Sequence, residues 1–372
     1  MARKLKSDKV LFLATLLLLF AGVVMVYSAS AVMAMERFGH PYMFLVKQAM
    51  WSALGLGTLA MVMRLDYRTY RQPTFIWLTL VIVVLALIAV LFSAPINGTR
   101  RWFGLGGIGL QPSELAKLAV IVFTAALLER RMHRINDVRY ALLPIGVVTV
   151  LVVGLVLLEP DFGTAVSILL VVGLMVFAAG LDWRYLAFSA AAAIPLAWFV
   201  LMSADYRRRR LLAFLNPWDD PLGDGFQIIQ SMIAVGTGGT LGKGLMEGVQ
   251  KLFYLPEPHT DFIYAVIGEE FGLVGTTLVL GSFVLIAWRG LRIASRAPDS
   301  FASFLAIGLT AMVAVQAFIN MSVVLGLMPT KGIPLPLVSA GGSSLVINLI
   351  GIGILLNLSQ HASTVHEVDE VE

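Results

Sequence analysis

The sequence predicts an all-α integral membrane protein with about ten transmembrane helices and a long extracytoplasmic loop between helices seven and eight. Hydrophobic residues make up 58% of the 372 residues and charged residues only 13%, whereas soluble domains contain roughly 25% charged residues. The apolar residues also occur in runs of about 20, the length that crosses a bilayer as a helix. We therefore expect residues 1–372 to form a single polytopic membrane domain.

The first apolar run follows four basic residues and could be mistaken for a secretory signal. It extends from Val10 to about Tyr27, which is long for the apolar part of a signal, and no suitable small-residue cleavage site follows. It is therefore predicted to be the first membrane helix. The ten predicted membrane segments are 10–30, 43–63, 74–94, 113–128, 141–158, 162–181, 184–203, 262–288, 301–328 and 343–358.

Lys and Arg in the short loops predict the orientation of these helices, because basic residues are retained on the cytoplasmic side. With a cytoplasmic N-terminus, the short outer loops hold only Arg37, Arg100, Arg101 and Lys331. An even number of helices then places the C-terminus in the cytoplasm as well. The acidic, polar tail 361–372 is expected to be disordered. The basic residues predicted in cytoplasmic loops are Arg64, Arg68, Arg71, Arg130, Arg131, Arg134, Arg139, Arg184, Arg289, Arg292 and Arg296.

The predicted outer loop 204–261 is the longest segment outside the membrane. It contains the run Arg207–Arg210, which is an exception to the charge rule, but long loops cross a membrane largely regardless of charge. Loops of this length are usually functional or disordered. The aromatic and apolar residues of this loop predict ordered structure that lies on the membrane face.

The strongest local signal is the sequence LPEPHTDFIY at residues 255–264, where the long loop meets the eighth segment. Thr260 is a plausible N-cap with Asp261 in the first turn, where a carboxylate favours the helix dipole. Alternatively, Asp261 is a carboxylate at the membrane surface whose pKa is raised by partial desolvation, which would make it a better base. The sequence leaves both interpretations open.

Four other acids and one lysine occur within or next to the predicted membrane segments. Glu114 and Lys117 are three residues apart on one helix face, so they either pair and line a polar groove or mark a helix start with a lysine that extends to the interface. Asp161 follows a Glu-Pro break and has the same two interpretations. Glu269 and Glu270 are expected to face a cavity or a partner, because charge inside a membrane is costly.

Two further segments are candidates for substrate contacts. Arg100 and Arg101 lie beside Trp102 on the predicted outer side, where they either anchor the interface or hold a phosphate. Residues 328–344 contain three prolines and three glycines in an apolar context. Such irregular backbone is tolerated at membrane depth only where it is buried in protein or lines a wet cavity.

Several kinds of site are excluded or disfavoured. The absence of cysteine excludes disulfides and cysteine-ligated zinc or iron–sulfur sites. The five histidines lack metal-ligand spacing, although an oxygen-liganded cation stays open. The glycine-rich run 236–244 does not fit a nucleotide phosphate loop, since Thr237 and Gly244 occupy positions that require Gly and Ser or Thr.

Taken together, these segments resemble the SEDS family (shape, elongation, division and sporulation) of polytopic peptidoglycan polymerases. Within that family, the sequence FLNPWDDP at 214–221, the PTKG at 329–332 and the NLSQH at 357–361 favour the cell-division branch over the elongation branch. One departure is Ala340, where the family usually has Tyr. The matching motifs are NGTRRW at 97–102, QPSELAK at 111–117, EPDFGT at 159–164, LPEPHTDFIY at 255–264 with GEE at 268–270, PTKG at 329–332 and GGSS at 341–344.

The resemblance implies a peptidoglycan glycosyltransferase that works at the division septum of the bacterial inner membrane. The donor would be a growing glycan on undecaprenyl pyrophosphate and the acceptor lipid II. Asp261 matches the family's essential aspartate, which would deprotonate the acceptor hydroxyl in an inverting transfer. The other candidate substrate-binding residues are Lys331, Arg100, Arg101, Glu114, Lys117, Asp161, His259, Thr260, Ser343 and Ser344.

The resemblance also implies partners and a limited choice of cofactors. A class B penicillin-binding protein, an FtsI-like transpeptidase, would cross-link the glycan, and other division proteins would join it. A divalent cation, Mg or Mn, is a candidate to stabilise the leaving pyrophosphate, while no nucleotide or organic cofactor is expected. Two alternatives stay open at this point, a lipid II flippase and a non-catalytic scaffold that recruits the transpeptidase.

Overall fold

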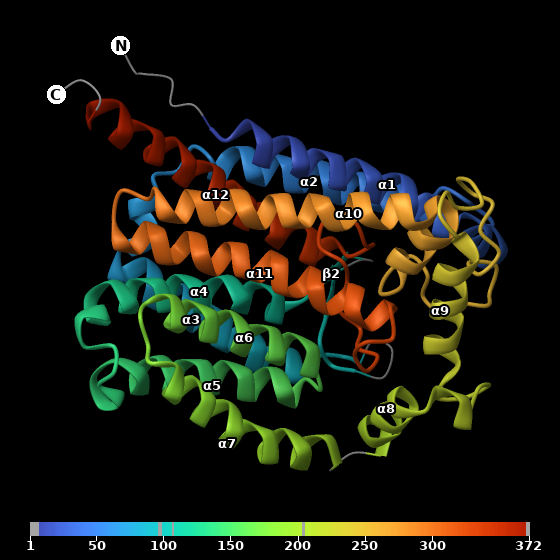
Figure 1. Ribbon diagram of the computed structural model, residues 1–372, viewed down its shortest axis with the longest axis horizontal. Helices are drawn as coiled ribbons and strands as arrows, with labels where there is room; N and C mark the ends of the chain where they lie inside the picture. The colour runs from blue at the N-terminus through green and yellow to red at the C-terminus, as the bar shows by residue number, and fades with distance from the viewer. Residues whose placement is uncertain (1–6, 96–98, 106–107, 203–204, 370–372) are drawn as a thin grey trace.

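The computed structural model describes residues 7–95, 99–105, 108–202 and 205–369 (Figure 1). The N-terminal basic residues before Ser7, Asn97 and Gly98 of the NGTRRW motif, and the last three residues lie outside the described residues. The α-helices are α1 (Lys9–Phe38), α2 (Met43–Val62), α3 (Pro73–Leu91), α4 (Pro112–Arg131), α5 (Leu143–Leu158), α6 (Phe162–Ala178), α7 (Trp183–Met202), α8 (Asp205–Leu215), α9 (Phe226–Gly238), α10 (Ile263–Ser295), α11 (Ser300–Val324) and α12 (Gly342–Asp369).

The helices follow the predicted membrane segments closely. Within the described residues, seven helices are long and apolar enough to cross a membrane: α1, α2, α3, α5 with the π-helical turn η3 (Val138–Leu142) before it, α10, α11 and α12. The other three predicted segments correspond to α4, which carries charged residues, to the shorter α6, and to α7. The chain is therefore a multi-pass membrane protein, and the seven candidate spans among the described residues lie where apolar runs predict them.

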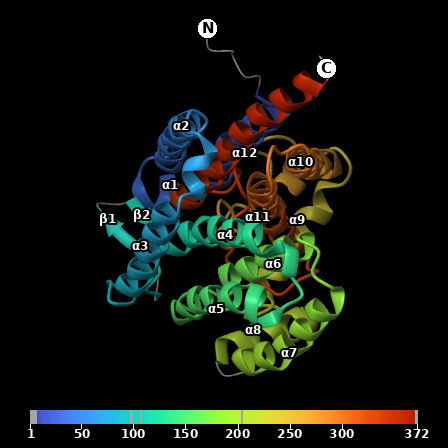
Figure 2. The same cartoon turned by 90° about the vertical axis from the view of Figure 1, so that its left-hand side faces the viewer.

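The centre of the bundle is formed by α4, α11 and α12, which are mostly buried (Figure 2). α11 contacts α4, α6, α10 and α12, and α12 also packs against α2. Helices α1, α2, α3, α5, α7 and α10 expose many large apolar side chains. A large exposed apolar surface would cause aggregation in water, so we infer that these helices face lipid.

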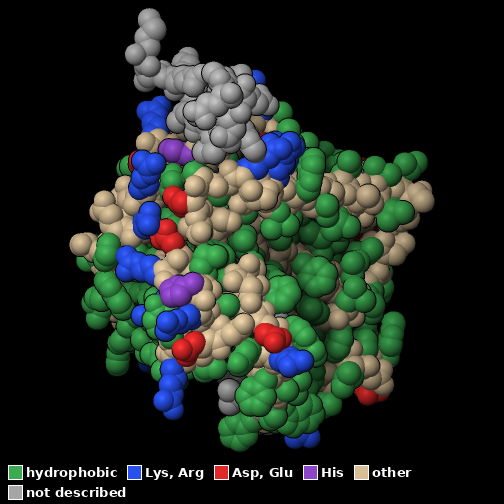
Figure 3. Space-filling view, turned by 60° about the vertical axis from the view of Figure 1, so that its left-hand side comes forward, with side chains coloured by type: hydrophobic (Ala, Val, Ile, Leu, Met, Phe, Trp, Pro, Cys, Tyr) green, Lys and Arg blue, Asp and Glu red, His purple; other side chains and the backbone are tan. Residues whose placement is uncertain are grey.

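The two ends of the bundle differ. The N-terminus and the end of α12 lie at one end, and α8 and α9 lie at the other (Figure 1). Figure 3 brings the end with the termini forward and shows Lys and Arg side chains distributed over it, whereas hydrophobic side chains dominate the flank. This separation agrees with the predicted grouping of both termini with the basic loops, on the side opposite the long loop.

The long loop is ordered, as the sequence predicts. It contains α8, a 3₁₀ turn η4 (Pro217–Asp219) and α9. After α9 the chain crosses over α10 at a kink, where Gly272 has non-helical backbone angles (φ 62°, ψ −154°). A Cβ at Gly272 would lie 2.5 Å from the backbone nitrogen of Gly242, so the crossing requires glycine. The eighth predicted membrane segment is therefore kinked where its own loop crosses it.

Two further details differ from the predictions. A short antiparallel hairpin, β1 (Phe103–Leu105) and β2 (Ile108–Leu110), lies between α3 and α4 in this otherwise helical chain. The tail predicted to be disordered begins as helix, because α12 continues to Asp369. No Gly or Pro occurs between His361 and Asp369 to end the helix, and composition alone did not reveal this continuation.

Candidate active site

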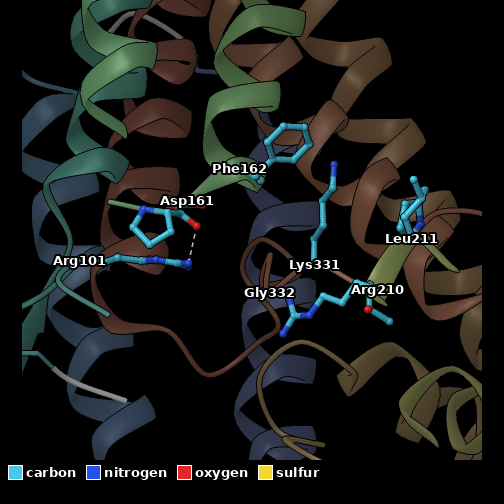
Figure 4. Close-up of a pocket in the computed structure, with 11 residues that line it drawn as sticks. Arg101, Asp161, Phe162, Arg210, Leu211, Lys331 and Gly332 are labelled. Atoms are coloured by element: carbon cyan, nitrogen blue, oxygen red, sulfur yellow. Dashed lines mark hydrogen bonds between the residues drawn. The ribbon is translucent and has the colours of Figure 1, made fainter. Parts of the chain in front are cut away.

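A pocket opens between the start of α6, helix α8 and the irregular segment that joins α11 to α12 (Figure 4). It encloses about 670 Å³ of empty space that includes an opening to solvent. Its lining residues are Arg101, Pro160, Asp161, Phe162, Gly163, Arg210, Leu211, Pro329, Thr330, Lys331 and Gly332.

Arg101 and Asp161 form one wall of this pocket. The Arg101 guanidinium donates from Nε to the backbone oxygen of Glu159 (2.8 Å) and from Nη2 to that of Pro160 (2.5 Å). These two hydrogen bonds supply donors to backbone carbonyls just after the end of α5, which lack a partner within the helix. Asp161 is the N-cap of α6, and its carboxylate accepts from the Thr164 backbone N–H (3.1 Å) and hydroxyl (2.8 Å). Both side chains are fixed by structural contacts at the pocket edge.

The carboxyl of Glu159 lies next to this wall and is wholly buried. Among the described residues, neither of its carboxyl oxygens has a hydrogen-bond partner. Burial, reinforced by the negative charge of Asp161, raises the pKa of Glu159 to about 8. The group is therefore mostly protonated at neutral pH and adds little negative charge to the pocket wall.

Lys331 comes from the irregular segment and forms the opposite side of the pocket. Its Nζ lies 4.4 Å from the centroid of the Phe162 ring, a cation–π contact visible in Figure 4. Burial lowers the pKa of Lys331, which indicates that its charge is only partly solvated. Asn320 of α11 holds the segment in place by donating from Nδ2 to the Ile333 carbonyl (2.8 Å).

Asp261 lies beside the same segment. Asn320 Nδ2 also donates to the Asp261 carbonyl (2.8 Å), and a Cβ added at Gly332 would be 3.0 Å from Asp261 Oδ2. The carboxyl group therefore borders Gly332 of the pocket. Burial raises the pKa of Asp261 to about 7, with a further contribution from Glu257, while Arg210 and Arg101 oppose the rise.

The structure contradicts one of the two interpretations of Asp261. α10 begins at Ile263 with Phe262 at the N-cap and no side-chain cap bond, so the expected Thr260 cap with Asp261 in the first turn is wrong. Within the described part of the chain, the Asp261 carboxylate accepts no hydrogen bond and forms no ion pair. Since it supports no helix end, the carboxylate is available to a ligand.

Arg210 is the pocket residue that sequence reasoning missed. It belongs to α8 and enters the pocket together with Leu211, and Figure 4 shows its side chain extending toward Gly332. The run of four arginines was noted only as an exception to the charge rule. One signal could have identified Arg210. The four arginines lie in a long loop on the predicted outer side, whose short loops carry few basic residues.

Glu114 and Lys117 lie behind the pocket. Their ion pair, which the spacing allowed, has an Nζ–Oε2 distance of 2.9 Å, and Lys117 Nζ also donates to Gln316 Oε1 (2.7 Å). Both side chains are only 4% exposed, so Lys117 does not extend to the interface. They line a smaller cavity that shares Gly163 and Gly332 with the pocket, which places them next to the pocket floor.

The structure does not bring the remaining candidates into the pocket. Arg100 is turned away and donates to the Leu91 carbonyl (3.1 Å). His259 packs against the Phe44 ring at 4.5 Å, and the Thr260 carbonyl accepts from the Ser339 hydroxyl. Ser343 and Ser344 are buried at the start of α12. Proximity in the sequence to a pocket residue was therefore a poor guide to side-chain direction.

Glu269 and Glu270 have partners, as their membrane position required. Lys243 pairs with Glu269 (2.7 Å) and Lys251 with Glu270 (2.6 Å), and Ser28 of α1 also donates to Glu270. Glu269 accepts the backbone N–H groups of residues 249 and 250 as well. These two pairs attach the end of the long loop to α10, just before the chain reaches Asp261.

The donor set around the pocket limits how a divalent cation could bind. Among the described residues, no three His, Asp or Glu side chains are grouped to hold a metal ion. Asp161 already accepts hydrogen bonds from Thr164 and Gln111, which leaves the Asp261 carboxylate. Mg²⁺ is commonly held by one or two carboxylates together with substrate phosphates, so a cation here would need ligands from the substrate.

Comparisons with known proteins agree with this architecture. A family model described as "Cell cycle protein", covering FtsW, RodA and SpoVE, matches residues 8–364. A Geobacter sulfurreducens protein named "Probable peptidoglycan glycosyltransferase FtsW" is 45% identical over 358 residues, 95% of each chain. The Bacillus subtilis "Stage V sporulation protein E" is 42% identical over 367 residues, 97% of this chain and 99% of that one.

Solved structures extend the likeness to the whole fold. A chain from a peptidoglycan synthase complex that coordinates polymerization and crosslinking has a TM-score of 0.79 at 34% identity, over 96% of this chain and 99% of that one. The Thermus thermophilus rod shape-determining protein RodA has a TM-score of 0.71 at 29% identity, over 96% and 97% of the two chains. The chain therefore belongs to the FtsW/RodA/SpoVE family of membrane-embedded cell-cycle proteins, as its motifs predicted.

Proposed function

We propose that this chain, a peptidoglycan glycosyltransferase by its family, polymerises lipid II with Asp261 as the general base of an inverting transfer. The observation that carries the proposal is the unengaged Asp261 carboxylate beside a pocket lined by Lys331, Arg101 and Arg210. A base next to a cluster of cations suits a reaction in which a hydroxyl attacks and an anionic group leaves.

The reaction would proceed as a single displacement. The Asp261 carboxylate takes the proton of the acceptor's sugar 4-hydroxyl as its oxygen attacks the anomeric carbon of the donor. The bond from that carbon to the lipid pyrophosphate breaks, and configuration at the carbon inverts. Lys331, Arg101 and Arg210, which line the pocket, stabilise the charge that accumulates on the pyrophosphate.

A divalent cation, Mg or Mn, remains a prediction of the resemblance. Bound through the substrate pyrophosphate, it would supply further positive charge to the leaving group. Asp161 already accepts hydrogen bonds from Gln111 and Thr164, and Asp261 must stay free to accept a proton, so most ligands of the cation would come from the substrate. Glu114 and Lys117 would support the pocket floor beneath Gly332.

The partner proposal rests on the synthase complex found among the structural relatives. We expect polymerisation to be weak for the purified chain and to rise when its cognate class B penicillin-binding protein, an FtsI-like transpeptidase, is co-purified. Labelled lipid II, followed by separation of the glycan products, measures this directly. Translocation of lipid II without polymer would support a flippase, and neither activity in the complex would support a scaffold. Full activity that the partner does not change would contradict the partner proposal.

We also propose that both termini are cytoplasmic and that the loop containing α8 and α9 is extracytoplasmic. The chain has no native cysteine, so single-cysteine labelling is straightforward. Leu222→Cys, at an 88% exposed position of the loop, should react with an impermeant reagent in intact spheroplasts. Thr69→Cys, exposed between α2 and α3 at the opposite end, should react only after lysis. The reverse pattern would overturn the orientation.

A further inference from the structure

A second charged pocket lies at the end of the bundle opposite Asp261, where α1, α10 and α12 meet. It encloses about 990 Å³ of empty space that includes an opening to solvent. Four basic side chains and one carboxylate line it, together with Ser7, Val10 and residues of α10 and α12. The charged lining residues are Asp8, Lys9, Arg289, Arg292 and Arg296.

The single carboxylate is already engaged. Asp8 caps α1 by accepting the backbone N–H groups of residues 10 and 11, and it pairs with Arg289, whose Nη2 lies 2.6 Å and Nε 2.8 Å from Asp8 Oδ2. Among the described residues, Lys9, Arg292 and Arg296 form no ion pair. The pocket therefore holds three basic side chains whose charge nothing described neutralises.

The walls of the pocket continue directly into the lipid-facing surface. Val10 lines the pocket and is 39% exposed, and Trp288, one residue before Arg289, is 56% exposed. The Arg289 and Arg292 guanidinium groups lie 5.5 and 6.0 Å from the Trp288 ring centroid. A Trp beside basic residues at a helix end is typical of the headgroup layer of a membrane, so a ligand here would meet cations and apolar side chains together.

We propose that this pocket binds the phosphate headgroup of an anionic phospholipid, with the acyl chains lying along the exposed apolar side chains of α1 and α10. Arginine forks suit phosphate oxygens, and basic pockets between membrane helices are known to select anionic headgroups. A simpler explanation is that these basic residues only set the orientation of the chain in the membrane. Orientation requires positive charge at this end of the bundle, but it does not require the charged side chains to line a pocket between three helices.

The test compares lipids on the full-length chain purified in detergent. Dioctanoyl phosphatidylglycerol is expected to bind saturably, as measured by native mass spectrometry and by a rise in melting temperature, whereas dioctanoyl phosphatidylcholine and inorganic phosphate are not. Arg292→Gln combined with Arg296→Gln should weaken phosphatidylglycerol binding by about tenfold or more. The matched control, Arg134→Gln with Arg139→Gln, removes the same charge from exposed positions between α4 and α5 and should bind like the unmodified chain.

Three results would overturn the proposal. Equal loss in both double variants would mean that overall charge, and not this pocket, attracts the lipid. Equal binding of phosphatidylcholine would remove the headgroup phosphate charge as the determinant. Inorganic phosphate that displaces phosphatidylglycerol at millimolar concentration would indicate a site for free phosphate. Because none of these measurements uses polymerisation, the result is independent of the catalytic role of Asp261.

Discussion

Asp261→Asn is expected to lose glycan polymerisation, by about 10²–10⁴-fold, which is the usual cost of removing a general base. Asparagine nearly preserves the size of the side chain but cannot take up the proton of the attacking hydroxyl. The variant should still insert into the membrane and associate with its partner. The measurement is polymerisation of labelled lipid II at matched protein level with the partner present.

The structure gives a reason to expect normal folding of this variant. The Asp261 side chain caps no helix, since Phe262 is the N-cap of α10, and the segment is held through the Asp261 backbone carbonyl by Asn320. A suitable control is Glu247→Gln, which neutralises an exposed acid of the same long loop and should leave polymerisation unchanged. Near-wild-type polymerisation by Asp261→Asn would contradict the proposed role of Asp261 as the general base.

The same carboxyl should impose a pH dependence. Burial and the negative charge of Glu257 raise the pKa of Asp261 to about 7, and a base acts only when deprotonated. The value of kcat/KM should therefore fall about tenfold for each pH unit below that pKa and level off above it. The residual activity of Asp261→Asn should not show this fall at acidic pH. If the fall persisted in the variant, the titrating group would be a residue other than Asp261.

The helices were predictable because lipid imposes a simple length and composition rule. Each predicted segment begins within a few residues of a helix, and α10, for example, starts at Ile263 where 262 was expected. The kink at Gly272 was not predictable, since it depends on the loop that crosses over it at Gly242. The continuation of α12 to Asp369 shows that a polar, acidic composition does not by itself end a helix.

The site was predictable in part. Asp261, Lys331, Arg101 and Asp161 were named from motifs, and the structure brings them to one pocket or its border. Motif membership could not separate Arg101 from its neighbour Arg100, because the two side chains find different backbone acceptors, the Leu91 carbonyl for Arg100 and the Glu159 carbonyl for Arg101. The contribution of α8 could not be read from sequence, because it requires a loop helix to fold back onto the bundle.

Lys331→Met is expected to reduce kcat by about 10²–10³-fold, the range found when one charge-stabilising donor is removed from an active site. The substitution shortens the unbranched side chain by one heavy atom and removes its charge. Burial lowers the pKa of Lys331, so its ammonium group is poorly solvated, and an anionic leaving group would raise that pKa again. The charge is therefore better stabilised in the transition state than in the empty pocket.

A neighbouring pair of arginines supplies the controls for this variant. Arg100→Gln removes a positive charge that is turned away from the pocket toward the Leu91 carbonyl, so polymerisation should stay near the wild-type rate. Arg101→Gln removes a charge that lines the pocket but also two hydrogen bonds to the end of α5, so it should lower both activity and melting temperature. Lys331→Met should lower activity with little change in melting temperature, because its contact with Phe162 is a single cation–π pair. A loss confined to KM, with kcat unchanged, would assign Lys331 to substrate binding and contradict its role in stabilising the leaving group.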